Sequence, residues 1–477
     1  MTPDATPPCA NCQRLQAQLE ALQARFEALE ATVARLQQQL AAARKDSSNS
    51  SKPPSSDIVK PPKPQPPPGQ RRRKPGGQPG HASHQRVPFP PEMLASAPTD
   101  YLLDACPACG GHLLVTDAAE PAVVQRVEIG AVPLEIHEHR SYPGWCPHCR
   151  RECYAPLPPS IERGGLAGPR LTTVIASLKG AYHASYSTVR KFVRDVIGLT
   201  ISRGQLAKIV GKVSRALERP YEELLGDLPG QAVLNVDETG HKHNGQQHWT
   251  WCFRAGLYTL FKIDPTRSAD VLIEVLGSEF DGVLGCDYFS AYRRYHREFG
   301  VVLQFCLAHL IREVKYLTTL PDARDRAYGE GLREALRGLF AVIHRREEWT
   351  AAGFRVRLDA ARDEVLARGA RDVPPTRASG NLAKRLEAHG DSYFRFITEP
   401  GVEPTNNLAE QAIRFVVIDR RITQGTRGER GDRWCERIWT VMATCSQQGR
   451  SVFAYLEAAV SAWFDAAEAP SLLPRES

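Results

Sequence analysis

The chain has 477 residues, too many for one ordinary domain, and 42% of them are hydrophobic, enough to build buried cores. No run reaches the ~18 apolar residues of a membrane span, and the first residues, MTPDATPPCANC, lack the layout of a signal peptide. We therefore expect a cytoplasmic protein, associated with the nucleoid. The net charge is +7, and residues 44–86 alone carry ten Lys or Arg and two Asp, a net of +8, so the remainder is close to neutral.

A heptad repeat occupies the first segment, residues 1–45. Two seams of apolar residues recur every seven positions: Leu15, Leu22, Leu29 and Leu36 in one, and Leu19, Phe26, Val33 and Leu40 in the other. Alternating spacings of four and three are the signature of a coiled coil. An isolated helix of this length is marginally stable, so we predict a homo-oligomer formed through the coiled coil. The alternative is an amphipathic helix that packs on the rest of its own chain.

A basic segment rich in Ser and Pro follows at 46–86. Eight of the sixteen residues 53–68 are proline, which favours extended polyproline geometry in a disordered linker. The cluster Arg71, Arg72, Arg73 and Lys74 is a candidate for contacts with DNA, because a basic arm on a near-neutral body suits a polyanion. A linker that only adds solubility is the alternative.

Two Cys-x-x-Cys pairs lie in the next segment, 87–160. They are formed by Cys106, Cys109, Cys146 and Cys149. In a cytoplasmic protein such pairs indicate a metal site more than disulfides. Four thiolates bind Zn²⁺ tetrahedrally, and a site closed in this way is structural. We therefore predict a small zinc-binding module.

Residues 166–228 show apolar positions at helical spacing, with a break at 198–202. The break is compatible with a helix-turn-helix, although a generic pair of helices has the same pattern. From 229 to 425 the predicted order is three strands, then helix, strand, helix, strand and helix. This order predicts an α/β fold with a mixed sheet, as in ribonuclease-H-like domains, interrupted by a helical insertion at about 322–395. Further helices are expected at 426–477.

Two aspartates stand at the expected ends of neighbouring strands. Asp237 is expected to end the first strand and Asp287 the fourth. Adjacent carboxylates repel each other and are best held by Mg²⁺, which prefers oxygen ligands and can promote phosphoryl transfer. A third acid is needed from a later helix, and Glu399, Glu403 and Glu410 are all candidates. For Asn406 we expect a helix-capping role, which would place Glu410 one turn into that helix.

Further polar residues lie near these acids. Seven arginines that follow Glu410 are candidates for binding DNA phosphates, or belong to an ion-paired surface with Asp419, Glu429, Asp432 and Glu436. They are Arg414, Arg420, Arg421, Arg427, Arg430, Arg433 and Arg437. His309 follows a strand and either contacts a phosphate or serves as a packed or capping histidine.

Eight motifs occur in the order of a known family. They are NSSKPPSSD (49–57), GGQPGH (76–81), CPACG with CPHC, VDET (236–239), DYFSAY (287–292), CLAHLIRE (306–313), NNLAEQAIR (406–414) and VFAYLEAAV (452–460). The chain resembles bacterial transposases of the insertion-sequence-sixty-six family over nearly its whole length. It departs from them at Gln411, where the family pattern has Arg.

This resemblance implies a DNA transposase of the three-carboxylate (DDE) type. It makes Asp237, Asp287 and Glu410 the catalytic ligands of Mg²⁺ or Mn²⁺, and the four cysteines ligands of structural Zn²⁺. The implied partners are terminal inverted repeats, target DNA and accessory proteins of the same element. A catalytically inactive or domesticated transposase that only binds DNA is the alternative, and a nuclease that cuts without joining is a third possibility.

Overall fold

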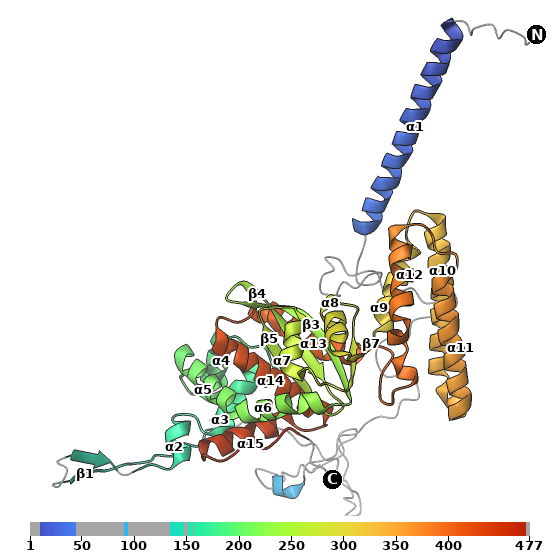
Figure 1. The fold of residues 1–477 in the computed structure, drawn as a ribbon. Helices are drawn as coiled ribbons and strands as arrows, with labels where there is room; N and C mark the ends of the chain where they lie inside the picture. Colours follow the sequence, from blue (N-terminus) through green and yellow to red (C-terminus); the bar gives the residue numbers. More distant parts are fainter. Residues whose placement is uncertain (1–9, 44–89, 94–133, 147–150, 155, 474–477) are drawn as a thin grey trace, which may run out of the picture. The chain divides into compact units, whose positions relative to one another are not determined.

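The computed structural model describes residues 10–43, 90–93, 134–146, 151–154 and 156–473 (Figure 1). The chain divides into two units. The larger comprises residues 1–61, 139–194 and 199–477, and the smaller comprises 62–138 and 195–198. Of the smaller unit, a short helix η2 (Pro91–Met93) is described. None of the described helices combines the length and the apolar character that crossing a membrane would require.

The first helix, α1 (Ala10–Ala43), contains the whole heptad repeat. The eight apolar seam residues are between 45% and 64% exposed, although side chains of this kind are normally buried. The predicted helix is therefore confirmed, with both apolar seams exposed in a single chain. That the seams pair with another copy stays a prediction.

The Cys-rich segment is described only in part. Strands β1 (Pro143–Cys146) and β2 (Arg151–Tyr154) form an antiparallel pair. Cys106, Cys109 and Cys149 lie outside the described residues, as does the side chain of Cys146. The basic cluster 71–74 also lies outside them. The zinc-binding module and the DNA contacts of the arm therefore stay predictions.

Helices fill residues 159–227. They are α2 (Pro159–Gly164), α3 (Pro169–Gly180), α4 (Tyr186–Phe192), the π-helix η3 (Val193–Ile197), α5 (Arg203–Ala216) and α6 (Glu218–Asp227), followed by the 3₁₀ turn η4 (Leu228–Gly230). Two serines fix helix starts, because Ser185 accepts a hydrogen bond from Thr188 N and Ser202 accepts one from Gln205 N. The helix-turn-helix interpretation of this region stays a prediction.

A five-stranded mixed sheet forms the centre of the larger unit. Its strands are β3 (Val233–His243), β4 (Gln246–Arg254), β5 (Thr259–Asp264), β6 (Val283–Cys286) and β7 (Val302–Phe305). The order across the sheet is β5-β4-β3-β6-β7. The first three strands are antiparallel, whereas β6 and β7 run parallel to β3. The predicted mixed α/β sheet is confirmed, with helices α7 (Ala269–Leu276), α8 (Ser290–Phe299) and α9 (Leu307–Leu317) in the expected places.

The predicted end of the first strand was wrong. Asp237 lies inside β3, which continues to His243, whereas Asp287 directly follows β6 as expected. The pairing of β3 with β6 stops at Asn235, but the pairing with β4 continues to the hairpin tip. Polar residues extend the strand because backbone hydrogen bonds to β4 hold it without an apolar pattern.

Helices also fill the segment between the sheet and the C-terminal region. They are α10 (Ala323–His344), α11 (Ala351–Ala370) and α12 (Arg377–His389), with 3₁₀ turns η5 (Arg346–Glu348), η6 (Gly390–Tyr393) and η7 (Arg395–Ile397). Of these, α10 packs on α9 and the turn η6 packs on β7. The domain boundaries expected from the sequence stay predictions.

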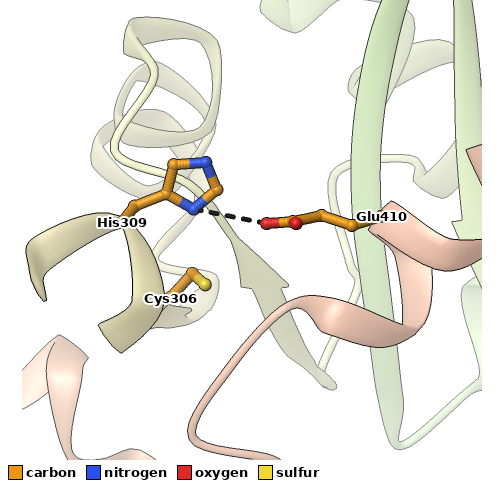
Figure 2. A group of neighbouring side chains, drawn as sticks. All are labelled: Cys306, His309 and Glu410. Carbon is orange, nitrogen blue, oxygen red and sulfur yellow. Dashed lines mark ion pairs between the residues drawn. The ribbon is translucent and has the colours of Figure 1, made fainter. Parts of the chain in front are cut away.

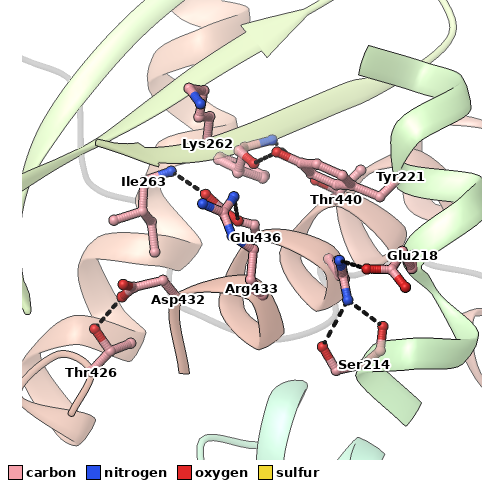
Figure 3. A network of polar contacts seen from close by, with 12 residues as sticks. Ser214, Glu218, Tyr221, Lys262, Ile263, Thr426, Asp432, Arg433, Glu436 and Thr440 are labelled. Carbon is pink, nitrogen blue, oxygen red and sulfur yellow. Dashed lines mark hydrogen bonds and ion pairs between the residues drawn. The ribbon is translucent and has the colours of Figure 1, made fainter. Parts of the chain in front are cut away.

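The last helices are α13 (Asn407–Thr423), α14 (Glu429–Gln447) and α15 (Val452–Phe464). Helix α13 packs on β3 and β4, and α14 lies along the edge strand β5. Three side chains of α14, spaced four residues apart, accept hydrogen bonds from backbone N–H groups of β5, spaced two residues apart. Glu436 accepts from Ile263 N (2.6 Å), Thr440 from Phe261 N (3.0 Å) and Thr444 from Thr259 N (3.2 Å). Figure 3 shows the first of these hydrogen bonds.

The spacing of the acceptors along α14 matches the spacing of the donors along β5. Four helical residues advance ~6 Å and two strand residues about 6.6 Å, so successive turns of α14 meet successive free N–H groups of β5. The exposed edge of the sheet is thereby closed by side chains.

Candidate active site

Two aspartates stand on neighbouring parallel strands, where the parallel part of the sheet ends. Asp237 lies in β3 just beyond its pairing with β6, and Asp287 follows β6. Each is oriented by one backbone N–H: Asp237 Oδ1 accepts from Glu238 N (2.9 Å) and Asp287 Oδ1 accepts from Phe289 N (2.8 Å). Both residues are partly exposed.

A tether at the start of α13 brings the third predicted acid to the same place. Asn406 is 2% exposed, and its Nδ2 donates to the carbonyl oxygen of Val236 (2.7 Å), across 170 residues of chain. Its backbone N–H donates to Cys306 Sγ (3.1 Å). Asn406 does occupy the N-cap position, but its side chain makes no capping hydrogen bond, so the capping role expected for it was wrong. The side chain instead fixes α13 beside Asp237, and Glu410 lies in the first turn of that helix.

Asp237 lies within electrostatic reach of both Asp287 and Glu410. Burial raises the pKa of Asp237 well above its ordinary value, and the charges of Glu238, Asp287 and Glu410 raise it further. Burial and the charge of Glu238 also raise the pKa of Asp287, to about 6. Like charges in a partly dry site disfavour each other's ionised form. The charges of Asp287 and Glu410 both disfavour the ionised form of Asp237, and a bound cation would relieve this repulsion.

Sequence reasoning missed a fourth acid, Glu238. Its side chain is 1% exposed, and one carboxylate oxygen accepts from Arg267 Nε (2.7 Å) while the other accepts from the hydroxyl of Tyr292. The Arg267 guanidinium also lies 3.9 Å from the ring centroid of Phe289. The only signal for Glu238 in the sequence was its position next to Asp237. Its partners come from separate elements, so spacing alone could not have identified them.

His309 and Arg312 of α9 approach Glu410 from the other side. His309 Nδ1 lies 3.7 Å from Glu410 Oε1, and Arg312 Nη2 lies 3.5 Å from Glu410 Oε2. Arg312 Nη1 also donates to His309 Nε2 (3.3 Å). Burial lowers the pKa of His309, and the charge of Arg312 lowers it further. The charges of Glu410 and Asp287 act in the opposite direction, and the imidazole contacts the third carboxylate.

A basic cavity of about 700 Å³ lies at the tip of the β3–β4 hairpin, beside the C-terminal end of α13. Lys242, Arg420, Arg421 and Arg427 line it, and no acidic residue is among its described lining. Arg420 donates to Thr239 Oγ1 (3.1 Å), which ties the cavity to β3. Of the predicted arginines, Arg420, Arg421 and Arg427 thus line this cavity, whereas Arg414 is an exposed residue of α13 outside its lining.

The loop after α13 is held tightly against the hairpin. Thr426 N donates to Lys242 O (2.8 Å), and Asn244 N donates to Thr426 O (2.8 Å). Gly425 has φ +89°, and a Cβ there would lie 2.2 Å from Lys242 O, so only glycine fits. Two other arginines of the region form ion pairs: Arg433 pairs with Glu436, one of the acids named in the alternative, and Arg437 pairs with Glu218.

Two family models match the chain. One, described as Transposase IS66 family, covers residues 164–433, which is more than half of the chain and contains all three clustered carboxylates. The other, described as a family of unknown function (DUF6444), covers residues 3–87. No curated protein sequence matches the chain.

Proposed function

The chain belongs to the Transposase IS66 family, and from this premise we propose that it cleaves transposon ends and joins them to target DNA, using Asp237, Asp287 and Glu410. Family membership indicates a role in DNA transposition, and a transposase has to bind DNA. The three-carboxylate chemistry is the part that we add. The observation that carries it is the hydrogen bond from Asn406 Nδ2 to Val236 O. It fixes the first turn of α13, with Glu410, beside Asp237, whose strand pairs with the strand that Asp287 follows.

The donor set fits Mg²⁺ or Mn²⁺. The charges of Asp287 and Glu410 both act on Asp237, and hard cations of this kind prefer carboxylate oxygens. Glu410 Oε1 is buried, and no described residue forms a hydrogen bond with it. Bound there, the metal would activate an attacking oxygen and stabilise the leaving oxygen of a phosphodiester. The side chains themselves would fix the attack geometry, because Asp237, Asp287 and Asn406 are each held by hydrogen bonds.

The sheet supports the same proposal. Three antiparallel strands followed by two parallel ones, with an acid on the first and another after the fourth, is the arrangement expected of a ribonuclease-H-like domain. We therefore propose that fold for this part of the chain. In this arrangement Glu238, Arg267 and Tyr292 would support the site from within the protein, without contacting DNA.

Two further features support binding of DNA ends in pairs. The lining of the basic cavity at the hairpin tip includes Lys242, Arg420 and Arg427, cations that suit a phosphate backbone. The exposed apolar seams of α1 would be buried if two copies of the chain associated. We propose that the coiled coil brings together two chains, one for each transposon end, and that Zn²⁺ holds the predicted Cys106, Cys109, Cys146 and Cys149 module.

An assay on labelled DNA that contains the terminal inverted repeats tests the proposal. With Mg²⁺ the full-length protein is expected to produce a nick with a free 3′-hydroxyl and then a joined product, and without divalent metal neither should form. Binding without any cleavage would favour the DNA-binding alternative. Cleavage without joining would favour a nuclease. Either result contradicts the transposase proposal.

The basic cavity gives a separate prediction about affinity. Lys242→Ala and Arg427→Ala are each expected to weaken binding of terminal-repeat DNA and to reduce the slope of log affinity against log salt concentration by about 1, the effect of losing one phosphate contact. Fluorescence anisotropy at several salt concentrations measures both quantities. Arg371→Ala removes an exposed cation at the end of α11 and should change neither. Slopes equal to that of the wild type in both cavity variants would show that the cavity does not bind DNA.

A further inference from the structure

A thiol, an imidazole and a carboxylate meet between α9 and α13. Cys306 immediately precedes α9, His309 lies in its first turn, and Glu410 lies in the first turn of α13. One donor atom from each can be chosen such that all lie within 4.8 Å of one another. Figure 2 shows the imidazole of His309 and the carboxylate of Glu410 pointing toward each other, with the sulfur of Cys306 beside them.

The sulfur of Cys306 is buried and accepts a backbone hydrogen bond. Cys306 is 1% exposed, and burial raises the pKa of its thiol. Backbone N–H groups act in the opposite direction: Asn406 N donates to Sγ at 3.1 Å, and the N–H groups of His309 and Ala308 also lower the pKa. Donors of this kind at a helix N-terminus stabilise the negative charge that a metal-bound sulfur carries. The raised pKa means that the free thiol keeps its proton, and the backbone donors would stabilise the sulfur once a cation replaced that proton.

Two of the three donor atoms have unused hydrogen-bonding capacity. His309 Nδ1 and Glu410 Oε1 are both buried, and within the described part of the chain neither forms a hydrogen bond. Their separation of 3.7 Å is too long for a hydrogen bond between them. Buried polar atoms without partners are costly, so a group that engages both would stabilise the site. A cation placed between them and the sulfur would do so.

We propose that Cys306 Sγ, His309 Nδ1 and Glu410 Oε1 form a binding site for a thiophilic divalent cation such as Zn²⁺. Thiolate and imidazole ligands select Zn²⁺ over Mg²⁺, which takes oxygen ligands. The Cys-x-x-His spacing across the first turn of α9 brings both side chains to the same side of the helix. Three protein ligands leave a fourth position free. This site differs from the three-carboxylate site, but the two share Glu410.

Arg312 competes with the cation. An imidazole that binds metal through Nδ1 carries its proton on Nε2, so Nε2 can no longer accept the hydrogen bond from Arg312 Nη1. The guanidinium charge beside the site also opposes a second positive charge. Removing Arg312 should therefore tighten cation binding, a direction that mere damage to the fold would not produce.

Titration of the metal-free full-length protein with Co²⁺ tests the proposal. Absorbance of the cobalt–thiolate band and equilibrium dialysis together give the number of bound equivalents. Cys306→Ser and His309→Ala are each expected to bind one equivalent less than the wild type, and Arg312→Ala is expected to bind that equivalent more tightly. Cys445→Ser removes another buried thiol, in α14, and should match the wild type. The four cysteines at 106–149 are unchanged in every variant, so their contribution cancels.

Equal numbers of equivalents in Cys306→Ser, His309→Ala and the wild type would overturn the proposal. A variant that loses its fold is recognised by circular dichroism, and Glu410→Gln then provides the second test, with an expected loss of affinity of about tenfold or more for the same equivalent. Unchanged affinity in Glu410→Gln would also contradict the site.

One consequence rests on the proposed function, because it uses the role of Glu410 with Asp237 and Asp287. Zn²⁺ bound to Cys306, His309 and Glu410 would hold Glu410 away from the two aspartates. Mg²⁺-dependent cleavage would therefore be slower. Micromolar Zn²⁺ is expected to slow cleavage by the wild type more than by Cys306→Ser. Equal inhibition of both would contradict this regulation. A wild type without any cleavage would contradict only the proposed function, because the cobalt titration does not depend on activity.

Discussion

Asp237→Asn is expected to abolish cleavage of terminal-repeat DNA while leaving DNA binding intact. The asparagine oxygen can still accept the hydrogen bond from Glu238 N, so the local fold is kept. The lost charge removes a metal ligand, and stabilisation of the transition state by several kcal/mol is lost with it. That corresponds to a fall in rate of about 10³-fold or more. Single-turnover cleavage of labelled DNA in Mg²⁺ measures the rate, and anisotropy measures the binding.

The matched control is Asp281→Asn, which removes an exposed acid just before β6. Its cleavage rate should equal that of the wild type. If Asp237→Asn cleaved as fast as Asp281→Asn, Asp237 would not be a metal ligand.

Asp237→Asn should also stabilise the protein when no divalent metal is added. Asp237 has a raised pKa because burial and three neighbouring acids oppose its charge, so the ionised carboxylate destabilises the metal-free fold. Its contribution to stability is therefore greatest below its unfolded pKa and is lost as the pH rises through the folded value. Asn carries no charge at any pH. A stabilisation on the order of 1 kcal/mol would raise the Tm by about 2–4 °C at pH 8, and added Mg²⁺ should reverse the order of the two proteins.

The sequence indicated the mixed sheet because its strands are mostly apolar runs with turn residues between them. It could not indicate how far β3 extends, since Lys242 and His243 continue that strand through backbone pairing with β4. Backbone hydrogen bonds leave no trace in hydrophobic periodicity. The strand therefore had to be placed too short, and Asp237 was assigned to its end.

The third acid illustrates a second limit. Chemistry alone left Glu399, Glu403 and Glu410 open, and the family resemblance selected Glu410. The structure brings Glu410 to Asp237 through Asn406, whose side chain bonds to Val236 across 170 residues. A contact between such distant positions follows from tertiary packing. Local sequence pattern suggested only a helix cap for Asn406.

Buried polar residues were the hardest to interpret. Glu436 was expected to be part of an ion-paired surface, and it does pair with Arg433, yet it is 0% exposed and accepts a hydrogen bond from the edge of the sheet. Glu238 was not singled out at all. In both cases the residue type suggests a surface, and only the position of a distant partner shows that the carboxylate is buried.

Glu436→Leu is expected to be among the most destabilising substitutions in the chain. The substitution leaves the buried N–H of Ile263 without an acceptor and removes the partner of Arg433. An unsatisfied buried donor costs about 1–3 kcal/mol, and the loss of the edge contact between α14 and β5 adds to this. Urea unfolding followed by circular dichroism measures the loss. Glu429→Leu, at an exposed position in the first turn of α14, should change the midpoint little. A midpoint for Glu436→Leu equal to that of Glu429→Leu would refute the proposed role of Glu436 in closing the edge of the sheet.

Glu436→Gln separates the hydrogen bond from the charge. Burial raises the pKa of Glu436 to about 7, although the hydrogen bond from Ile263 N and the charge of Arg433 lower it. Since the folded value exceeds the unfolded one, the carboxyl contributes stability below about pH 4.5 that is lost as the pH rises through 7. The full difference is on the order of 3 kcal/mol. Glutamine keeps an acceptor for Ile263 N and does not titrate. Glu436→Gln should therefore gain stability relative to the wild type between pH 5 and pH 8, whereas a constant difference across that range would show that Glu436 is ionised throughout.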